Sequence, residues 1–558
     1  DIGADEYPGA HLALRAETPA IVLLPGQIFT YSIILASDGA LTATGTVLTF
    51  ALDPQQRAIS VTPGGVCTVN GDWGGNVTCP LGALPPGAEI AFVVTAQVAP
   101  TVPQAELMSS TATATADSTA SSVANVKTVS RARLVYPLSY EPDSLDVNRE
   151  SGNLNILTVL DQLMETLYRY GPDGSIIPAG ATGYTVSPDG LIYTVTLRTN
   201  AFWSDAIPVI AQHYANSVIR MLDPATGAGY AYVLYPIQGA WEFNTGATSD
   251  PATVGVAALD AYTLRFTLHS PAAYFPGILA TSALYPVRLD KLNAPTFVGN
   301  GPYRLQDWEA GRWLLLEKNP FYHSAAQVII PRILLPIIPP EAQIAAYEAG
   351  VLDVSEIPNA SVGYVLNHPT LNNELRSVPW PGVFYLGLNN VLTPTNNLAV
   401  RQALASAVDR EALLMLLSTP WREAATSVIP PGIPGYQNDV VGYAYNPTQA
   451  RTYLAAAGYP GGAGFPGVEL WINEPHRPLA EALAAGWRNV LNISVTVTYP
   501  ANYMAQLRAC HDTPGTCSYN AYRLGWLVDY ADAANILDDL FHPDGANQFT
   551  GWDNARYR

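Results

Sequence analysis

Residues 399–417 read AVRQALASAVDREALLMLL, and the spacing of their apolar side chains indicates the fold class of the larger part of the chain. One apolar stripe recurs at helical spacing, formed by Val400, Leu404, Val408, Leu413 and Leu414. Helical patterns also occur at 211–222 and 447–457, and strand patterns at 193–197 and 263–268. Because strands lie between helical segments, we expect an α/β architecture from residue 131 onward.

The length of this mixed region sets the number of cores. The chain has 558 residues, of which more than 400 have the α/β texture. A single hydrophobic core rarely grows to this size, so at least two lobes are expected. Hydrophobic residues make up 48% of the chain, which is enough for sizeable cores and excludes a mainly disordered protein.

The first 125 residues have a different pattern, with short strands and no helical periodicity. Runs rich in β-branched and aromatic residues occupy 27–36, 45–52 and 89–98, and clusters of Gly, Pro, Ser and Asp separate them. This spacing predicts an all-β sandwich over residues 1–125.

The junction between the two parts is marked by small polar residues. Residues 111–117, TATATAD, alternate strictly and are expected to form the last strand of the sandwich, at an edge. Residues 118–122 have the composition of a linker. We place the sandwich at 1–125, the linker at 126–132 and the second part at 133–558.

The charge balance excludes one class of partner. The chain has 27 basic and 46 acidic residues, a formal net charge of −19. Nucleic-acid phosphates are repelled by such a surface, so no nucleic-acid partner is expected. The most apolar stretch, 328–340, is interrupted by Arg332 and four prolines, and it falls short of the roughly 20 apolar residues that span a bilayer.

The four cysteines form two local pairs, Cys67 with Cys79 and Cys510 with Cys517. Neither pair has the spacing that zinc sites favour, so the preferred interpretation is two short-loop disulfides formed in an oxidising compartment. Metal binding remains the alternative.

Motifs for catalysis are missing from the sequence. It has no GxSxG elbow, no phosphate-binding GxxxxGK loop and no HExxH pair. We therefore expect a binding protein with no cofactor and no metal, and a hydrolase is the least favoured alternative. The 31 tyrosines and 11 tryptophans fit a binding surface, although each aromatic side chain on its own is better explained by core packing.

Two resemblances sharpen these expectations. Residues 1–125 resemble the immunoglobulin-like bacterial surface-protein repeat DUF11, through GQIFTYSI (26–33), ASDG (36–39) and CPLGALPPG (79–87). Residues 133–558 resemble the family 5 extracellular solute-binding proteins, the oligopeptide- and dipeptide-binding subunits of ABC importers. The matching motifs, in chain order, are EPDSLD (141–146), LMETL (163–167), SPDGLIY (187–193), FWSD (202–205), GNGPY (299–303), EKNPFY (317–322), YEAGVLD (347–353), VRQAL (400–404) and GWLVDY (525–530).

The second resemblance implies a two-lobed α/β protein of the periplasmic-binding type with a smaller extra domain. Lobe I is expected at about 133–164 and 286–385, the extra domain at about 165–285, and lobe II at about 386–558. The implied ligand is a peptide held as an extended strand, and the implied partners are the membrane subunits of an ABC importer. The implied location is extracellular, associated with the bacterial cell surface.

The resemblance also implies site residues. Asp529 would bind the peptide α-amino group, because a buried ammonium needs a carboxylate partner; the alternative is an ordinary helix N-cap. The remaining implied ligand contacts are Arg523, Gly525, Trp526, Leu527, Tyr230, Ser151, Gly152 and Asn153.

Two departures from the family pattern stand out. Ala206 replaces the usual glycine after Trp203-Ser204-Asp205, and the chain stops at Arg558, where family members continue for several dozen residues.

A different class of function competes with peptide capture. The added β module is unusual for a simple importer receptor, so the alternative is a structural protein of the cell surface or an extracellular layer that reuses the solute-binding fold. In that case residues 1–125 would provide the assembly contact. Sequons at Asn76, Asn359 and Asn492 permit glycosylation of such a protein.

Overall fold

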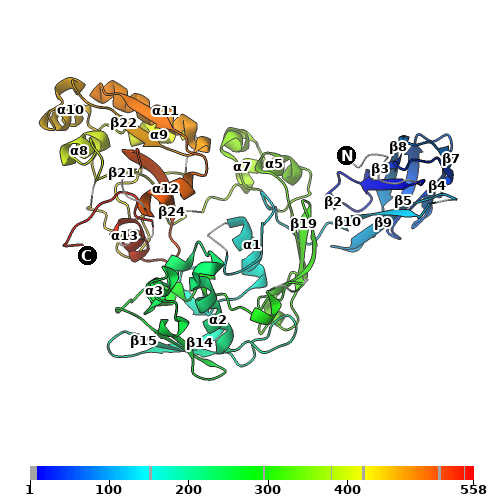
Figure 1. Cartoon of the computed structure of the whole chain (residues 1–558), viewed down its shortest axis with the longest axis horizontal. Coiled ribbons are helices and arrows are strands. Elements are labelled where there is room, and N and C mark those ends of the chain that lie inside the picture. The colour runs from blue at the N-terminus through cyan, green and yellow to red at the C-terminus, as the bar shows by residue number, and fades with distance from the viewer. Residues whose placement is uncertain are drawn as a thin grey trace.

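A computed structural model shows three packed regions in a row (Figure 1). The structure describes residues 9–117, 119–149, 154–292, 294, 296–378, 380–417, 421–440, 442–512, 517–543, 545 and 547–557. We call residues 9–130 the sandwich, 131–378 the middle region and 380–557 the C-terminal lobe. The sandwich and the C-terminal lobe lie at opposite ends of the long axis, with the middle region between them.

The sandwich consists of two sheets that share one core. The first sheet has the order β1 (Leu12–Glu17), β3 (Ile28–Ser37), β8 (Glu89–Val98), β5 (Gln56–Thr62). The second has the order β2 (Val22–Leu23), β10 (Ser122–Ser130), β9 (Leu107–Thr115), β4 (Ala43–Ala51), β7 (Asn76–Leu84), β6 (Thr68–Val69). Tyr31 of β3 contacts Phe50 of β4 edge to face, with ring centroids 4.9 Å apart. The predicted all-β region is confirmed, and the predicted Cys67–Cys79 bridge joins β7 to the segment before β6.

Two expectations about the end of the sandwich are wrong. Residues 111–115 belong to β9, which lies between β10 and β4 and is therefore neither the last strand nor an edge strand. The linker expected at 126–132 is mostly β10, which pairs antiparallel with β9 along its whole length. Buried and more exposed side chains alternate in the first part of β10, and Val126 packs into the core. Serine and alanine at its start gave the segment the composition of a linker.

The middle region begins with a four-stranded sheet against the sandwich. Its order is β11 (Leu134–Val135), β20 (Arg332–Pro336), β19 (Trp313–Lys318), β18 (Tyr303–Glu309). Trp313 is fully buried in a core that also contains Val129 of β10. Lys127 of β10 forms an ion pair with Asp307 of β18 at 2.9 Å. The sandwich is therefore joined to the middle region by shared packing as well as by the chain.

The rest of the middle region surrounds one large core. A second sheet has the order β14 (Ala181–Val186), β15 (Ile192–Leu197), β17 (Thr263–Thr267), β16 (Val256–Ala258), beside the hairpin β12 (Tyr168–Tyr170) and β13 (Ile176–Pro178). The helices are α1 (Leu154–Leu163), α2 (Ala211–Leu222), α3 (Ala240–Asn244), α4 (Phe275–Ile278), α5 (Pro340–Glu348), α6 (Val362–Asn367) and α7 (Leu371–Glu374). Leu163, Val195 and Leu314 belong to the same cluster, so this core reaches both sheets. Ala206 keeps a left-handed φ of 66°, so the expected turn forms without its glycine.

The C-terminal lobe is a mixed sheet covered by helices. The sheet has the order β21 (Gly382–Leu388), β24 (Ala521–Leu527), β22 (Val468–Trp471), β23 (Val495–Thr498). The helices are α8 (Leu398–Ser406), α9 (Arg410–Leu417), α10 (Pro447–Ala456), α11 (Arg477–Leu491), α12 (Tyr503–Asp512) and α13 (Ala534–Phe541). The helix expected over 399–417 is two helices, because the side chain of Asp409 accepts a hydrogen bond from the Ala412 amide and starts α9.

The stripe that indicated the α/β class is buried where it was expected, at Val400 and Leu404. The Cys510–Cys517 bridge is also present, so both predicted disulfides are confirmed. Within the ranges given above, no helix has the length and apolarity needed to cross a membrane.

Candidate functional site

The carboxyl group of Asp529 lies where the C-terminal lobe meets the middle region. Asp529 follows β24, and it accepts hydrogen bonds from the hydroxyl groups of Tyr230 and Tyr232, the latter at 3.0 Å. Both tyrosines come from a short turn of helix in the middle region. The sequence analysis singled out Tyr230 but missed Tyr232. Asp529 of the C-terminal lobe is thus in contact with the middle region, which is the position that a ligand held between the two would require.

Helix α13 does not need Asp529 as its cap. The amide of Ala534, at the start of this helix, is bound instead by the side chain of Asp532 at 2.9 Å. The carboxylate of Asp529 points to the two tyrosines and to Asn535. The alternative of an ordinary N-cap therefore has no support in the geometry.

Two carboxyl groups lie close together behind this point. The side-chain nitrogen of Asn535 donates to Asp529 at 2.9 Å and to Asp539 at 2.8 Å. Burial raises the pKa of Asp529. Burial, together with the charges of Asp529 and Asp538, raises the pKa of Asp539 well above its usual value. Neither Asp529 nor Asp539 has an ion pair with a described cation, and a ligand ammonium group beside them would favour their ionised forms.

The residues around Asp529 also form walls for a side chain. The rings of Tyr232 and Trp526 lie 6.2 Å apart. A cavity of about 180 Å³ borders Tyr232, and its other walls come from both sides of the interface: Ala228, Gly229, Ala231, Tyr235, Asn244, Arg508 and Asn547. This cavity is large enough for one side chain of a ligand held at Asp529.

Strand β24 has a free edge beside Asp529. On one side, Gly525, Trp526 and Leu527 pair with Phe384, Val383 and Gly382 of β21. On the other side, β22 pairs only with Ala521 and Tyr522. From Leu524 to Leu527, no other described strand lies on that side, so the backbone there is available to an extended peptide. The N–H and C=O groups of Arg523 are already bonded to the hydroxyl group of Tyr503. A side chain at Gly525 would collide with the ring of Phe384, which explains the glycine.

Positive charge gathers at the opposite end of this free edge. The guanidinium groups of Arg523 and Arg422 lie 4.5 and 5.5 Å from the ring centre of Phe384. Burial lowers the pKa of Arg523 to about 10, and its Nε atom has no hydrogen-bond acceptor among the described residues. Burial and the two arginines also lower the pKa of His476. An incoming carboxylate would give the Nε atom of Arg523 an acceptor, because a buried donor without one is costly.

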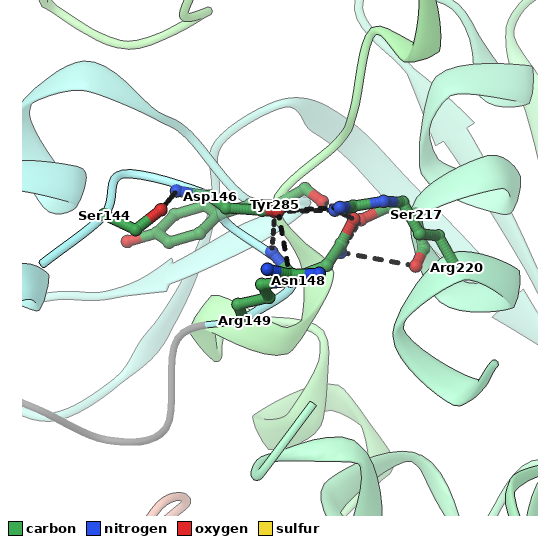
Figure 2. A network of polar contacts seen from close by, with 7 residues as sticks. All are labelled: Ser144, Asp146, Asn148, Arg149, Ser217, Arg220 and Tyr285. Atoms are coloured by element: carbon green, nitrogen blue, oxygen red, sulfur yellow. Dashed lines mark hydrogen bonds and ion pairs between the residues drawn. The ribbon is translucent and has the colours of Figure 1, made fainter. Parts of the chain in front are cut away.

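Ser151, Gly152 and Asn153 lie outside the described residues, but the chain just before them is firmly held (Figure 2). Arg220 of α2 makes two hydrogen bonds of 2.6 Å to Asp146, and Asn148 donates to Ser217 of α2 at 2.8 Å. Burial favours a higher pKa for Asp146, but the hydrogen bonds and charge of Arg220 lower it overall. Residues 144–149 are therefore fixed on α2 just before the predicted contact segment.

The sequence analysis missed part of this site. The missed residues are Tyr232, Phe384, Arg422, His476, Asn535 and Asp539. The spacing of Asn535 and Asp539, four apart on one helix after the GWLVDY motif, is the one signal that was available in the sequence.

Comparison with known proteins identifies the class. A family model for bacterial extracellular solute-binding proteins, family 5, matches residues 175–548. The chain belongs to this family, which confirms the resemblance seen in residues 133–558.

Individual relatives agree with the family match. The oligopeptide-binding protein OppA of Bacillus subtilis is 28% identical over 425 residues, which cover 72% of this chain and 76% of that protein. The periplasmic murein peptide-binding protein MppA of Escherichia coli is 28% identical over 444 residues, with coverage of 76% and 80%. The structure of Haemophilus influenzae OppA in complex with the peptide RPPGFSPFR has a TM-score of 0.62 at 25% identity, with coverage of 76% and 85%. These relatives are named as binding proteins, and their structures are two-lobed.

Proposed function

We propose that this protein captures short peptides between its C-terminal lobe and middle region and delivers them to an ABC importer. The observation that carries the proposal is the free edge of β24, which has a buried carboxyl group at one end and an unsatisfied arginine at the other. A peptide in extended form offers the matching groups: an ammonium, a row of backbone donors and acceptors, and a carboxylate.

Each predicted site residue has a role in this proposal. Asp529 binds the α-amino group, with Tyr230 as a neighbouring hydrogen-bond partner. The backbone of Gly525 and Leu527 pairs with the peptide backbone, and Trp526 forms one wall of a side-chain pocket. The Arg523 side chain meets a carboxylate of the ligand. Because backbone pairing is independent of side-chain identity, the protein would accept many peptide sequences.

The names of the relatives support the ligand class. OppA of Bacillus subtilis is named as an oligopeptide-binding protein, DppE of the same organism as a dipeptide-binding protein, and one OppA structure holds a nonapeptide. We therefore propose binding without catalysis for this chain.

The domain arrangement is part of the same proposal. Residues 133–558 would form two lobes that close over the peptide by a hinge movement. The sandwich would be an immunoglobulin-like module of the DUF11 type that serves as a spacer at the cell surface. The ion pair of Lys127 with Asp307 and the burial of Trp313 against β10 support a spacer that is fixed to the middle region.

A binding selection tests the proposed function. The full chain is incubated with a tryptic digest of casein, separated from free peptide, and the bound material is sequenced after denaturation. We expect one short peptide per chain, with many sequences represented. The same protein with C-terminally amidated and N-terminally acetylated digests should retain far less. Equal retention of blocked and unblocked peptides would refute the proposal, because both charged ends are needed.

A further inference from the structure

Asn535 occupies the centre of the site and uses its whole amide group. Its side-chain oxygen accepts hydrogen bonds from the Asp529 amide at 2.8 Å and from the Trp526 indole at 3.0 Å. Its side-chain nitrogen donates to the carboxyl groups of Asp529 and Asp539. A primary amide has two donor hydrogens and one oxygen that accepts two bonds, so every bond that Asn535 can make is made.

This set of bonds allows one orientation of the amide. If the amide flipped, its nitrogen would face two N–H donors and its oxygen would face two carboxyl groups. Asn535 is fully buried, so no alternative partner from solvent is at hand. The orientation of Asn535 therefore fixes three groups at once: the carboxyl group of Asp529, its backbone amide and the ring of Trp526.

Asp539 is one turn further along α13 and has no described cation as a partner. Its carboxyl group and that of Asp529 accept hydrogen bonds from the same amide nitrogen, so the two carboxyl groups are close neighbours. The other charged and titratable groups around this pair are Asp532, Asp538, Tyr170, Tyr230, Tyr232, Tyr274 and Tyr530. Burial and neighbouring acids raise the pKa of Asp539, and a ligand cation nearby would lower this pKa again.

We propose that Asn535 and Asp539 are positioning residues that give this chain its selectivity for ligands with a free amino group. Asn535 holds the Asp529 carboxyl group and the Trp526 wall in one arrangement. Asp539 adds a second negative group behind the first. This inference rests on the proposed function, since it assigns Asp529 to the ligand amine. Beyond that function, we infer that selectivity depends on Asn535 and Asp539, which do not contact the peptide themselves.

The test compares two forms of one peptide. The probe is the casein peptide most enriched on the wild-type chain, synthesised with a free amino end and with an acetylated amino end. Affinities of both forms are measured by isothermal titration calorimetry for the wild type, Asn535→Leu, Asp539→Asn and Asp539→Glu. Glu411→Gln is the control, because it removes one negative charge from the C-terminal lobe at an exposed position on α9, outside the site.

Selectivity, the ratio of the two affinities, is the readout. We expect Asn535→Leu and Asp539→Asn each to reduce this ratio about tenfold or more, mainly by weakening the free-amine form. Asp539→Glu should retain most of the ratio, and Glu411→Gln should leave it within about threefold of the wild type. If Asn535→Leu fails to fold, Asp539→Asn carries the test, because asparagine keeps an acceptor for Asn535 at the same size.

Two results would overturn the inference. An equal loss for both peptide forms would mean that Asn535 and Asp539 only stabilise the lobe, and an unchanged ratio would mean that they do not act on the amine site. Asp529→Asn, measured in parallel, separates this failure from failure of the proposed function. If Asp529→Asn removes selectivity while the variants at Asn535 and Asp539 keep it, only the positioning role of Asn535 and Asp539 is refuted. If Asp529→Asn also keeps selectivity, the amine assignment itself falls, and both proposals with it.

Discussion

Replacement of Asp529 by asparagine changes charge with almost no change in shape. The wild-type carboxyl group accepts hydrogen bonds from Tyr230, Tyr232 and Asn535. Asparagine keeps one acceptor oxygen, and a tyrosine hydroxyl can accept a hydrogen bond from its side-chain amide nitrogen, so the lobe should still fold. What the variant cannot do is offset the charge of a bound ammonium group.

The magnitude follows from the burial of this carboxyl group. Removing one partner from a buried, hydrogen-bonded charge pair costs about 2–5 kcal/mol of binding free energy. Because asparagine still offers an acceptor, we expect the lower part of that range, about 2–3 kcal/mol. One factor of ten corresponds to about 1.4 kcal/mol, so the dissociation constant should rise roughly 30- to 150-fold.

The assay is isothermal titration calorimetry at pH 7 with one casein-derived peptide and its N-acetylated form. Glu411→Gln serves as the control for a lost negative charge in the C-terminal lobe. We expect the loss to be confined to the free-amine peptide. A dissociation constant within about threefold of the wild type, or an equal loss for the acetylated form, would refute the reasoning.

The pH dependence of wild-type binding has a definite sign. Burial raises the pKa of Asp529, so in the free protein this carboxyl group takes up a proton at a higher pH than an exposed aspartate. A neutral carboxyl group attracts an ammonium group weakly. Affinity for the free-amine peptide should therefore fall as the pH is lowered from 7 to 5, and the acetylated form should show a smaller change.

Four further predictions concern other parts of the chain. Arg523→Met should weaken a peptide with a free carboxyl end about 10- to 100-fold, as expected for a lost hydrogen bond to a charged group, and should leave its C-terminal amide almost unchanged in the same titration. Asp539→Asn should raise the free energy of unfolding at pH 7 by about 1 kcal/mol in urea melts. Because burial raises the pKa of Asp539 in the folded protein, this carboxyl group lowers stability as the pH rises through its native pKa. The gain in the variant should therefore disappear below about pH 4. Ala206→Gly should raise the unfolding free energy by up to about 1 kcal/mol, because glycine adopts a φ of 66° without strain; a lower melting temperature would contradict this. A chain that begins at residue 133 should unfold at a lower temperature than the full chain, because Trp313 loses its cover, while its peptide affinity stays within about threefold.

The order of elements was predictable because it depends on periodic local patterns. The stripe at Val400 and Leu404 is buried as its spacing indicated, because a helix of 3.6 residues per turn places those side chains on one face. The break at Asp409 was missed because a helix start depends on one side-chain hydrogen bond, not on periodicity. Strand β10 was taken for a linker because its place in the sheet depends on pairing with other strands. One of them, β2, is distant in sequence, and the other, β9, has equally small side chains.

The candidate site was predictable along the GWLVDY motif and at Tyr230 and Arg523, which the family resemblance also implied. Asp529, Trp526 and the backbone of β24 follow from that one motif, which placed them on a strand and the turn after it. At the positive end only Arg523 was predicted, because Phe384 and Arg422 come from segments that meet it only in the folded lobe. Asn535 was missed because its spacing from Asp539, the one signal in the sequence, does not reveal that its amide also binds Asp529 and Trp526.

Native mass spectrometry of the full-length protein as isolated from its source tests the claim of peptide capture most directly. The account predicts a monomer that carries a heterogeneous extra mass, released on denaturation and sequenceable as short peptides with free amino ends. A large assembly without bound peptide would contradict it, and would indicate that the solute-binding fold serves a structural purpose through the sandwich.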